Sequence, residues 1–331
     1  MKYFSLFIVL AVGSIWGLGH KANLDIPNGL KTVVLTLTNK DLVKIGSRSG
    51  LENPVLLSSV LWRGSVEEEA LLETSGLAQS KIDNSLFYAI NDSGNDPKLF
   101  GLDSSGRHLG AWNIDYSPKH DFEDLAAFEI EGDSYLLVAD TGDNLNWRKS
   151  QSLLLFKEPS LDGLEKNLDV VKRVTFSFHD GHRDIESVAV DESGKTAYMV
   201  SKKRIPPEVF RVSLDHEGHQ ILEALGTINS IPAPTPVDLA RRGPFGIYSS
   251  LPTAMDFHSG NAVILTYKEL YLFEKKPDDD WVSVFSGVPK KIPLPQIYGL
   301  EAVAFAGPQK ILLTGERENG QKASEIFEVS F

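Results

Sequence analysis

Five segments of this chain resemble one another, and this internal repeat restricts the possible folds more than any other feature of the sequence. The segments begin at Ser75, Glu123, Glu186, Thr253 and Glu301. Each has a small or acidic first residue, a short apolar run, a polar turn, a second apolar run and a polar or charged end. Successive starts are 48 to 67 residues apart, and a period of about 50 residues is typical of propeller blades of four strands each.

The apolar runs that follow each start agree with an all-β fold, a β-propeller. Five blades are favoured, and six are possible if residues 25–60, which include the strand-like run 32–39, form another. Fourth strands are expected at 221–228 and 281–287, and single helical turns at 67–73 and 237–242. The alternative fold is an irregular β-sandwich, although sandwiches rarely show such self-similarity.

The last repeat contains only three strands before the chain ends at Phe331. A propeller must close its ring, because an open sheet would leave unpaired edges. The run Val60–Glu67 can supply the missing strand. We therefore expect a propeller domain over residues 60–331 that is closed by an N-terminal strand.

Residues 1–22 have the pattern of a secretory signal peptide, with one Lys, an apolar run and then small residues. An uncleaved membrane anchor is the alternative. Either one predicts a periplasmic or secreted protein, with residues 23–59 as an N-terminal segment before the propeller. We expect a monomer with no other membrane span.

Charge and composition exclude several functional classes. The net charge is −12, which disfavours a nucleic-acid partner because phosphates repel an acidic chain. The absence of Cys excludes disulfides, cysteine zinc sites and thiol nucleophiles. Nucleophile-elbow, P-loop, dinucleotide-binding and H-E-x-x-H motifs are absent from the sequence.

Acids and amides concentrate at two points of each repeat, where the first strand begins and where the second ends. In a propeller these two points open on the same face of the central channel. Acids at equivalent positions would repel one another or require a cation, and oxygen ligands suit Ca²⁺. The predicted metal ligands are Asn91, Asp92, Asp140, Asp143, Asn144 and Glu301. The loops before the strand starts add the charged residues Asp121, Arg183 and Asp184. The alternative is that these acids cap strand ends or form ion pairs.

The run Asp140–Asn144 (DTGDN) places two carboxylates and an amide within five residues at this face. Such runs are usually turns, and the pattern of an EF-hand loop is absent. We assign possible catalytic roles to Glu123, Asp124 and Glu186, any of which could act as a general base. The candidate ligand-binding residues are Arg148, Arg183, Lys202 and Arg317.

Several local motifs from about Glu73 to the C-terminus resemble those of an exported bacterial β-propeller family that is mostly uncharacterised. They read NDSG…LFGLD, DFEDLA, VADTGDN…R, DGHRDIESV, LTYKELYLF and GLEAVAF…TGE. This family is similar to the β-propeller phytases and to the SMP-30/gluconolactonase-type calcium propellers.

The resemblance implies a Ca²⁺ site lined by acids. Similarity to phytases implies a phosphate site to which Arg148, Arg183, Lys202, Lys203 and Arg317 would contribute. Similarity to lactonases implies one channel cation, and the counterparts by residue type are Glu123, Glu186, Asn91, Asn144 and Asp140.

Two functions follow from these observations. The first is a cell-envelope propeller whose acidic, Ca²⁺-binding top face holds a small ligand or a protein partner. The second is a metal-dependent hydrolase of a phosphoester or a lactone, in which the metal activates water or polarises the substrate. Loss of turnover on chelation would distinguish the hydrolase from the binding protein.

Overall fold

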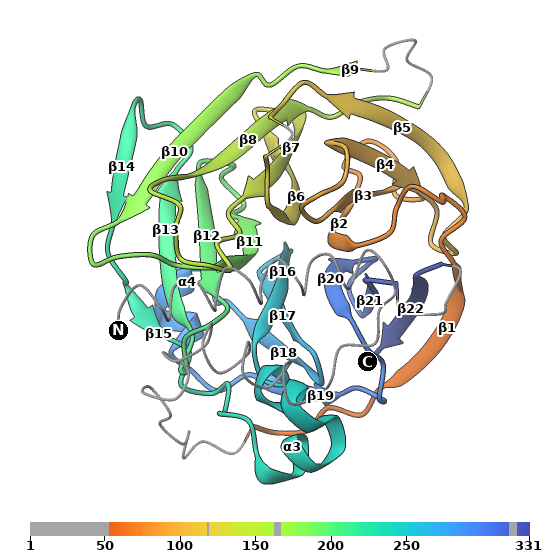
Figure 1. The fold of residues 1–331 in the computed structure, drawn as a ribbon, viewed down its shortest axis with the longest axis vertical. Helices are drawn as coiled ribbons and strands as arrows, with labels where there is room; N and C mark the ends of the chain where they lie inside the picture. Colours follow the sequence, from red (N-terminus) through yellow and green to blue (C-terminus); the bar gives the residue numbers. More distant parts are fainter. Residues whose placement is uncertain (1–52, 118, 162–166, 318–322) are drawn as a thin grey trace, which may run out of the picture.

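A computed structural model describes residues 53–331 except 118, 162–166 and 318–322. It contains five sheets around a central axis, the arrangement of a five-bladed β-propeller (Figure 1). We number the blades 1 to 5 by their innermost strands, β2, β6, β11, β16 and β20. The all-β fold and the five blades predicted from the repeat are confirmed.

The strands of each blade follow one another outward from the axis. Blade 1 contains β2 (Thr74–Gln79), β3 (Phe87–Asn91), β4 (Lys98–Leu102) and β5 (His108–Ile114). Blade 2 contains β6 (Phe122–Ile130), β7 (Asp133–Asp140), β8 (Gln151–Lys157) and β10 (Lys172–Phe178). Blade 3 contains β11 (Ile185–Val190), β12 (Thr196–Ser201), β13 (Glu208–Ser213) and β15 (Gly226–Thr227). Blade 4 contains β16 (Pro252–His258), β17 (Asn261–Thr266), β18 (Glu269–Glu274) and β19 (Lys290–Pro293).

Blade 5 closes the ring as the sequence predicts. Its three C-terminal strands are β20 (Leu300–Phe305), β21 (Lys310–Gly315) and β22 (Glu325–Ser330), and the fourth is β1 (Ser59–Ser65) from the N-terminal side. Strand β1 runs antiparallel to β22, with Trp62 opposite Phe327. Figure 1 shows β1 at the outer edge beside β22. The first and last described parts of the chain therefore share one sheet, which ties the ring together.

Two short strands connect neighbouring blades at their outer edges. Strand β9 (Asn167–Leu168), from the connection between β8 and β10, pairs in parallel with β5 of blade 1. Strand β14 (His219–Leu222), from the connection between β13 and β15, pairs in parallel with β10 of blade 2. The single fourth strand expected at 221–228 is therefore wrong, because its first part adds to blade 2 and only β15 belongs to blade 3.

A second correction concerns residues 281–287, which were expected to form a strand. Trp281–Phe285 is the short helix α4, and the fourth strand of blade 4 is β19. The side chain of Asp280 caps this helix by accepting hydrogen bonds from the amides of Val282 and Ser283. Trp281 and Phe285 then pack beside Phe257 between blades 3 and 4.

The expected helix at 237–242 is present within α3 (Pro236–Arg242), and the 3-10 helix η1 (Gly243–Tyr248) follows it. Residues 67–73 contain a turn and a bridge instead of a helix. Among the described residues, no helix has both the length and the apolar character needed to cross a membrane. The predicted signal peptide, the start of the N-terminal segment and the strand-like run at 32–39 lie outside the described residues.

The innermost strands are buried along almost their entire length, because each lies between two neighbouring blades. Apolar clusters fill the space between adjacent sheets; one contains Tyr88 and Trp112 of blade 1 together with Phe122 and Phe156 of blade 2. Apolar packing of this kind is the main favourable contribution to folding. Because apolar side chains fill the space between the blades, the polar side chains gather at the mouth of the channel.

The same irregularity occurs at the start of all five innermost strands. In each blade the pairing between the first two strands shifts by one residue, so that one extra residue of the inner strand has no partner. The extra residues are Ser75, Glu123, Glu186, Thr253 and Glu301. A β-bulge of this type redirects a side chain, and here it does so at the five starts that the sequence repeat identified.

Candidate functional site

The site is formed by two sets of five equivalent positions at one mouth of the channel. The first set, the bulge ring, consists of Ser75, Glu123, Glu186, Thr253 and Glu301. The hydroxyls of Ser75 and Thr253 donate to the carbonyls of Phe122 and Leu300, which precede the bulge of the following blade. These two residues join blades, whereas the three glutamates carry the charge of the site.

The second set, the exit ring, consists of the residue that follows the second strand of each blade. Its members are Asp92, Thr141, Lys202, Tyr267 and Glu316. Thr141 donates to the carbonyl of Ile185 and so joins blades 2 and 3. The other four are ionisable, and their pairing with the bulge ring determines the electrostatics of the mouth.

Asp92, Asp121 and Glu123 form the first group of carboxylates. Each offers one oxygen, and these oxygens lie within 4.8 Å of one another. Glu123 is only 5% exposed, and its Oε1 has no hydrogen-bond partner among the described residues. Burial, reinforced by Glu186 and Asp92, raises the pKa of Glu123 well above its usual value. A buried carboxylate oxygen beside other carboxylates and without a donor is the arrangement that a bound cation would satisfy.

Gly142 allows two of these carboxylates to come together. A Cβ atom built at this position would lie 2.5 Å from Cγ of Asp121, and closer still to Oδ2 of Asp121 and Oε1 of Glu123. The Gly142 amide also donates to the carbonyl of Asp121 at 3.2 Å. The glycine in the DTGDN run therefore leaves room for the carboxylates.

Glu123, Asp184 and Glu186 form the second group, with oxygens again within 4.8 Å of one another. Lysines already pair with two of these acids: Lys203 Nζ lies 2.7 Å from Oδ2 of Asp184, and Lys202 Nζ contacts Oε2 of Glu186. Although burial acts against it, Lys203 and Lys202 hold the pKa of Asp184 below its usual value. Burial raises the pKa of Glu186 to about 8 despite its contact with Lys202.

Blade 5 completes the mouth with Glu301 and Glu316. The Tyr267 hydroxyl donates to Oε1 of Glu301, and Lys202 Nζ lies 3.5 Å from the same oxygen. The charge of Glu301, together with burial, raises the pKa of Glu316 well above its usual value. Among the predicted site residues, Glu123, Glu186, Glu301, Asp92 and Lys202 are thus brought together.

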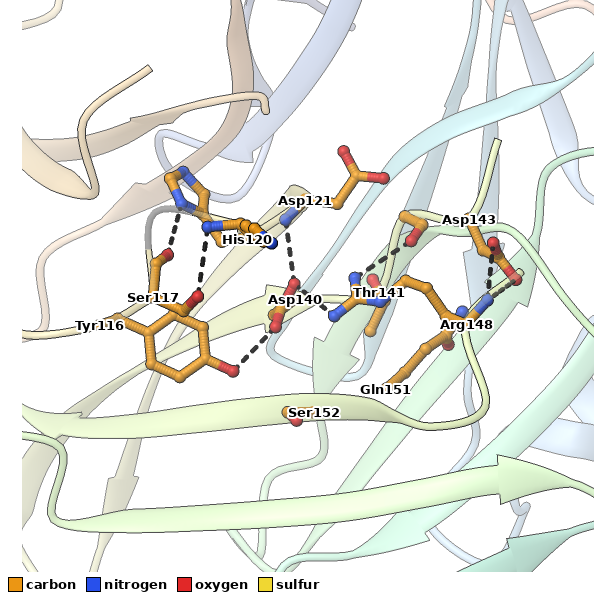
Figure 2. A network of polar contacts seen from close by, with 12 residues as sticks. Tyr116, Ser117, His120, Asp121, Asp140, Thr141, Asp143, Arg148, Gln151 and Ser152 are labelled. Carbon is orange, nitrogen blue, oxygen red and sulfur yellow. Dashed lines mark hydrogen bonds and ion pairs between the residues drawn. The ribbon is translucent and has the colours of Figure 1, made fainter. Parts of the chain in front are cut away.

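Asp140 and Arg148 form a separate network beside the site (Figure 2). Arg148 Nη2 lies 2.8 Å from Oδ1 of Asp140, and the Tyr116 hydroxyl donates to Oδ2 at 2.8 Å. Oδ1 of Asp140 also accepts the amide of Asp121 at 3.0 Å. Both carboxylate oxygens of Asp140 have polar partners, and the hydrogen bond from the amide of Asp121 places Asp140 behind that residue.

Three other predicted metal ligands stabilise loops through their own hydrogen bonds. The Asn91 side-chain oxygen accepts the amides of Leu72 and Glu73. Asp143 accepts the amide of Trp147 at 2.7 Å, and the exposed Asn144 accepts a hydrogen bond from Lys203 at 2.6 Å.

Two of the three predicted ligand-binding arginines pair with acids outside the two carboxylate groups: Arg148 with Asp140, and Arg183 with two others. Arg183 is buried and pairs with Asp180 and Glu208. The Arg148 guanidinium also donates to the carbonyl of Gly142. Arg317 is exposed, and its amide donates to the carbonyl of Leu72.

Asp124 has a different environment from that expected of a general base. It is fully buried, and its two oxygens accept the backbone amides of Leu125, Val188 and Met255. These amides belong to the innermost strands of blades 2, 3 and 4. Asp124 is thus a link between three blades.

Five residues of the site were not among the predicted catalytic, metal-ligating or ligand-binding residues, although the resemblance to phytases implied a role for Lys203: Asp121, Asp184, Lys203, Tyr267 and Glu316. Four of them lie within two residues of a predicted one, and Tyr267 is equivalent to Asp92 in the repeat. Tyr267 and Glu316 directly follow second strands, where the repeat predicts that polar residues concentrate.

Comparison with known proteins gives no functional assignment. No known family profile matches the chain, and no curated protein matches it in sequence. Among solved structures, the PQQ-bound aldose sugar dehydrogenase of Streptomyces coelicolor is similar, with 13% identity, a TM-score of 0.47, and coverage of 84% of this chain and 99% of that one. Glutaminyl cyclase of Myxococcus xanthus gives 12% identity, a TM-score of 0.46, and coverage of 84% and 97%. At these values the similarities carry no argument about cofactor or reaction.

Proposed function

We propose that this propeller binds one divalent cation, Ca²⁺ by its all-oxygen ligand set, at the mouth of its channel, and that the cation holds a small uncharged ligand. The observation that carries the proposal is Oε1 of Glu123, a buried oxygen that has no donor among the described residues, on a side chain that lies together with Asp92 and Asp121. Carboxylate oxygens are the ligands that Ca²⁺ prefers. The signal-like residues 1–22 support a location in the periplasm or outside the cell.

Charge selects the first carboxylate group as the cation site. In the second group, ammonium groups contact Asp184 and Glu186. Among the described residues, no ion pair involves Asp92, Asp121 or Glu123. A cation therefore gains most at the first group, where it would relieve the repulsion among three carboxylates.

Charge also selects the kind of ligand. The seven carboxylates of the mouth are Asp92, Asp121, Glu123, Asp184, Glu186, Glu301 and Glu316. Lys202, Lys203 and one divalent cation would neutralise four of these seven charges, so the ionised mouth would stay negative. This favours a neutral, oxygen-rich ligand, such as a polyol or a lactone, over a phosphoester. The pairing of Arg148 and Arg183 with acids supports the same choice.

Hydrolysis of a lactone is the second candidate function. It is favoured by Glu186, whose pKa of about 8 suits proton transfer near neutral pH. A cation at the first group would polarise the ester carbonyl. In a panel of lactones, turnover that is lost in EDTA and restored by Ca²⁺ would establish a hydrolase, and binding without turnover would establish a binding protein.

The proposal is tested by calcium titration of chelator-stripped protein, followed by calorimetry and thermal unfolding. A cation that binds only the folded state stabilises it by ~2.7 kcal/mol at a hundred times its dissociation constant. Glu123→Gln should abolish this gain. The matched control is Glu129→Gln, on an exposed residue of the same strand. A melting curve that millimolar Ca²⁺ leaves unchanged would refute the cation site.

A further inference from the structure

Lys202 differs in charge from its four equivalents in the exit ring. Those positions carry Asp92, Thr141, Tyr267 and Glu316. A lysine at a channel mouth would normally extend its ammonium group into water. Lys202 instead is 8% exposed, which requires close compensation of its charge.

The Lys202 ammonium group lies between carboxylates from two different blades. It contacts Oε2 of Glu186 in blade 3 and lies 3.5 Å from Oε1 of Glu301 in blade 5. Its Nζ is also 5.5 Å from the centre of the Tyr267 ring. Carboxylate oxygens and an aromatic face on several sides form an environment for a cation.

We propose that the Lys202 ammonium group fills a second cation position of the channel and thereby limits the site to one divalent cation. The inference rests on the proposed cation at Asp92, Asp121 and Glu123. Glu186 has an oxygen within 4.8 Å of oxygens of Glu123 and Asp184, so these acids could hold a metal if they were free. With Lys202 present, a divalent cation there would have to displace the ammonium group or be repelled by it.

Removal of the ammonium group should therefore create a second site. In Lys202→Gln, Glu186 and Glu301 lose their shared positive partner, while the cation site of the first group keeps its three carboxylates. Carboxylates left in this state must take up protons or bind a cation. Near neutral pH and with millimolar Ca²⁺, we expect the second cation to bind.

The experiment measures bound calcium per chain by equilibrium dialysis and elemental analysis of the full-length protein. We expect one calcium for the wild type, two for Lys202→Gln and one for Lys202→Arg, which keeps the charge. Lys291→Gln is the control, because it removes a partly buried lysine that lies 3.2 Å from Glu269 on blade 4, and it should bind one calcium.

The outcomes separate this inference from the proposal on which it rests. A wild-type chain that binds no calcium overturns the proposed function itself. One calcium in both the wild type and Lys202→Gln, or two in the wild type, overturns the role of Lys202 alone. If Lys202→Gln does not fold, the wild-type crystal soaked in Tb³⁺ decides: one anomalous peak beside Asp92 and Asp121 supports the inference, and a second peak beside Glu186 refutes it.

Discussion

The substitution Gly142→Ala should separate the cation site from the fold. A Cβ at position 142 would lie 2.5 Å from Cγ of Asp121, whereas ordinary contacts are 3.4–4 Å. The carboxylate of Asp121 must therefore move by about 1 Å, and that of Glu123 must move as well. Neither movement involves backbone, because both groups are the ends of side chains, and Gly142 has no left-handed φ to restrict substitution.

The expected cost falls on cation affinity. Displacement of groups that position metal ligands typically lowers affinity by about 10- to 100-fold, or ~1.4–2.7 kcal/mol. At a calcium concentration a hundred times the wild-type dissociation constant, the gain in the free energy of unfolding should fall from ~2.7 kcal/mol to between ~1.4 and ~0.4 kcal/mol. Without calcium, the free energy of unfolding of the variant should lie within about 1 kcal/mol of the wild-type value, because the apolar core is unchanged.

Isothermal titration calorimetry measures the affinity, and urea unfolding in EDTA measures the stability. Gly226→Ala is the control, since a Cβ there would meet nothing closer than Cγ1 of Val282 at 3.7 Å. Calcium affinity of Gly142→Ala within twofold of the wild type would refute the placement of the cation between Asp121 and Glu123. Loss of folding in EDTA would refute the claim that the clash is confined to side-chain ends.

Two further predictions concern pH and Asp124. Folding raises the pKa of Glu186 to about 8 and also raises the pKa values of Glu123 and Asp92. The folded state therefore binds more protons than the unfolded state, and the free energy of unfolding in EDTA should fall as pH rises, by about 2 kcal/mol or more between about pH 5 and pH 8 in urea unfolding. Excess Ca²⁺ should reverse this trend because it needs ionised carboxylates. A free energy of unfolding in EDTA that rises over this range would contradict the raised pKa values of these buried carboxylates. Asp124→Asn should lower the free energy of unfolding by about 2–4 kcal/mol, because it disturbs three buried hydrogen bonds that backbone amides donate to this side chain. Calcium affinity should change less than threefold, and an unchanged urea midpoint with lost affinity would show that Asp124 belongs to the cation site.

The sequence repeat predicted the blade count and the ring closure because both follow from the order of apolar runs. The errors arose where local residues outweighed that order. Residues 281–287 (WVSVFSG) have the composition of a strand, but Asp280 caps a helix and Trp281 and Phe285 fill the gap between two blades. Residues 221–228 form parts of two strands, because the first of them adds to the edge of the preceding blade.

The site was predictable at the level of the repeat and not at the level of single residues. Glu123 and Asp124 are adjacent acids at a strand start, and nothing in their composition distinguishes them. The bulge decides: Glu123 is the extra residue that joins Asp92 and Asp121, while Asp124 resumes the pairing and accepts amides from neighbouring blades.

Partner choice explains the remaining differences between predicted and observed sites. Asp140 and Arg148 have the residue types of a metal ligand and an anion-binding residue and lie next to the site, but they form an ion pair with each other. Lys202 and Glu186 also form an ion pair, but Lys202 lies in the exit ring and Glu186 in the bulge ring, so both reach the channel, where Glu301 of blade 5 lies beside Lys202. The charged residues of this mouth lie in the bulge ring or the exit ring, two residues before a bulge residue, as Asp121 and Asp184 do, or directly after an exit-ring residue, as Lys203 does. Composition identifies the acids, whereas the five-fold repeat of the backbone determines which of them meet.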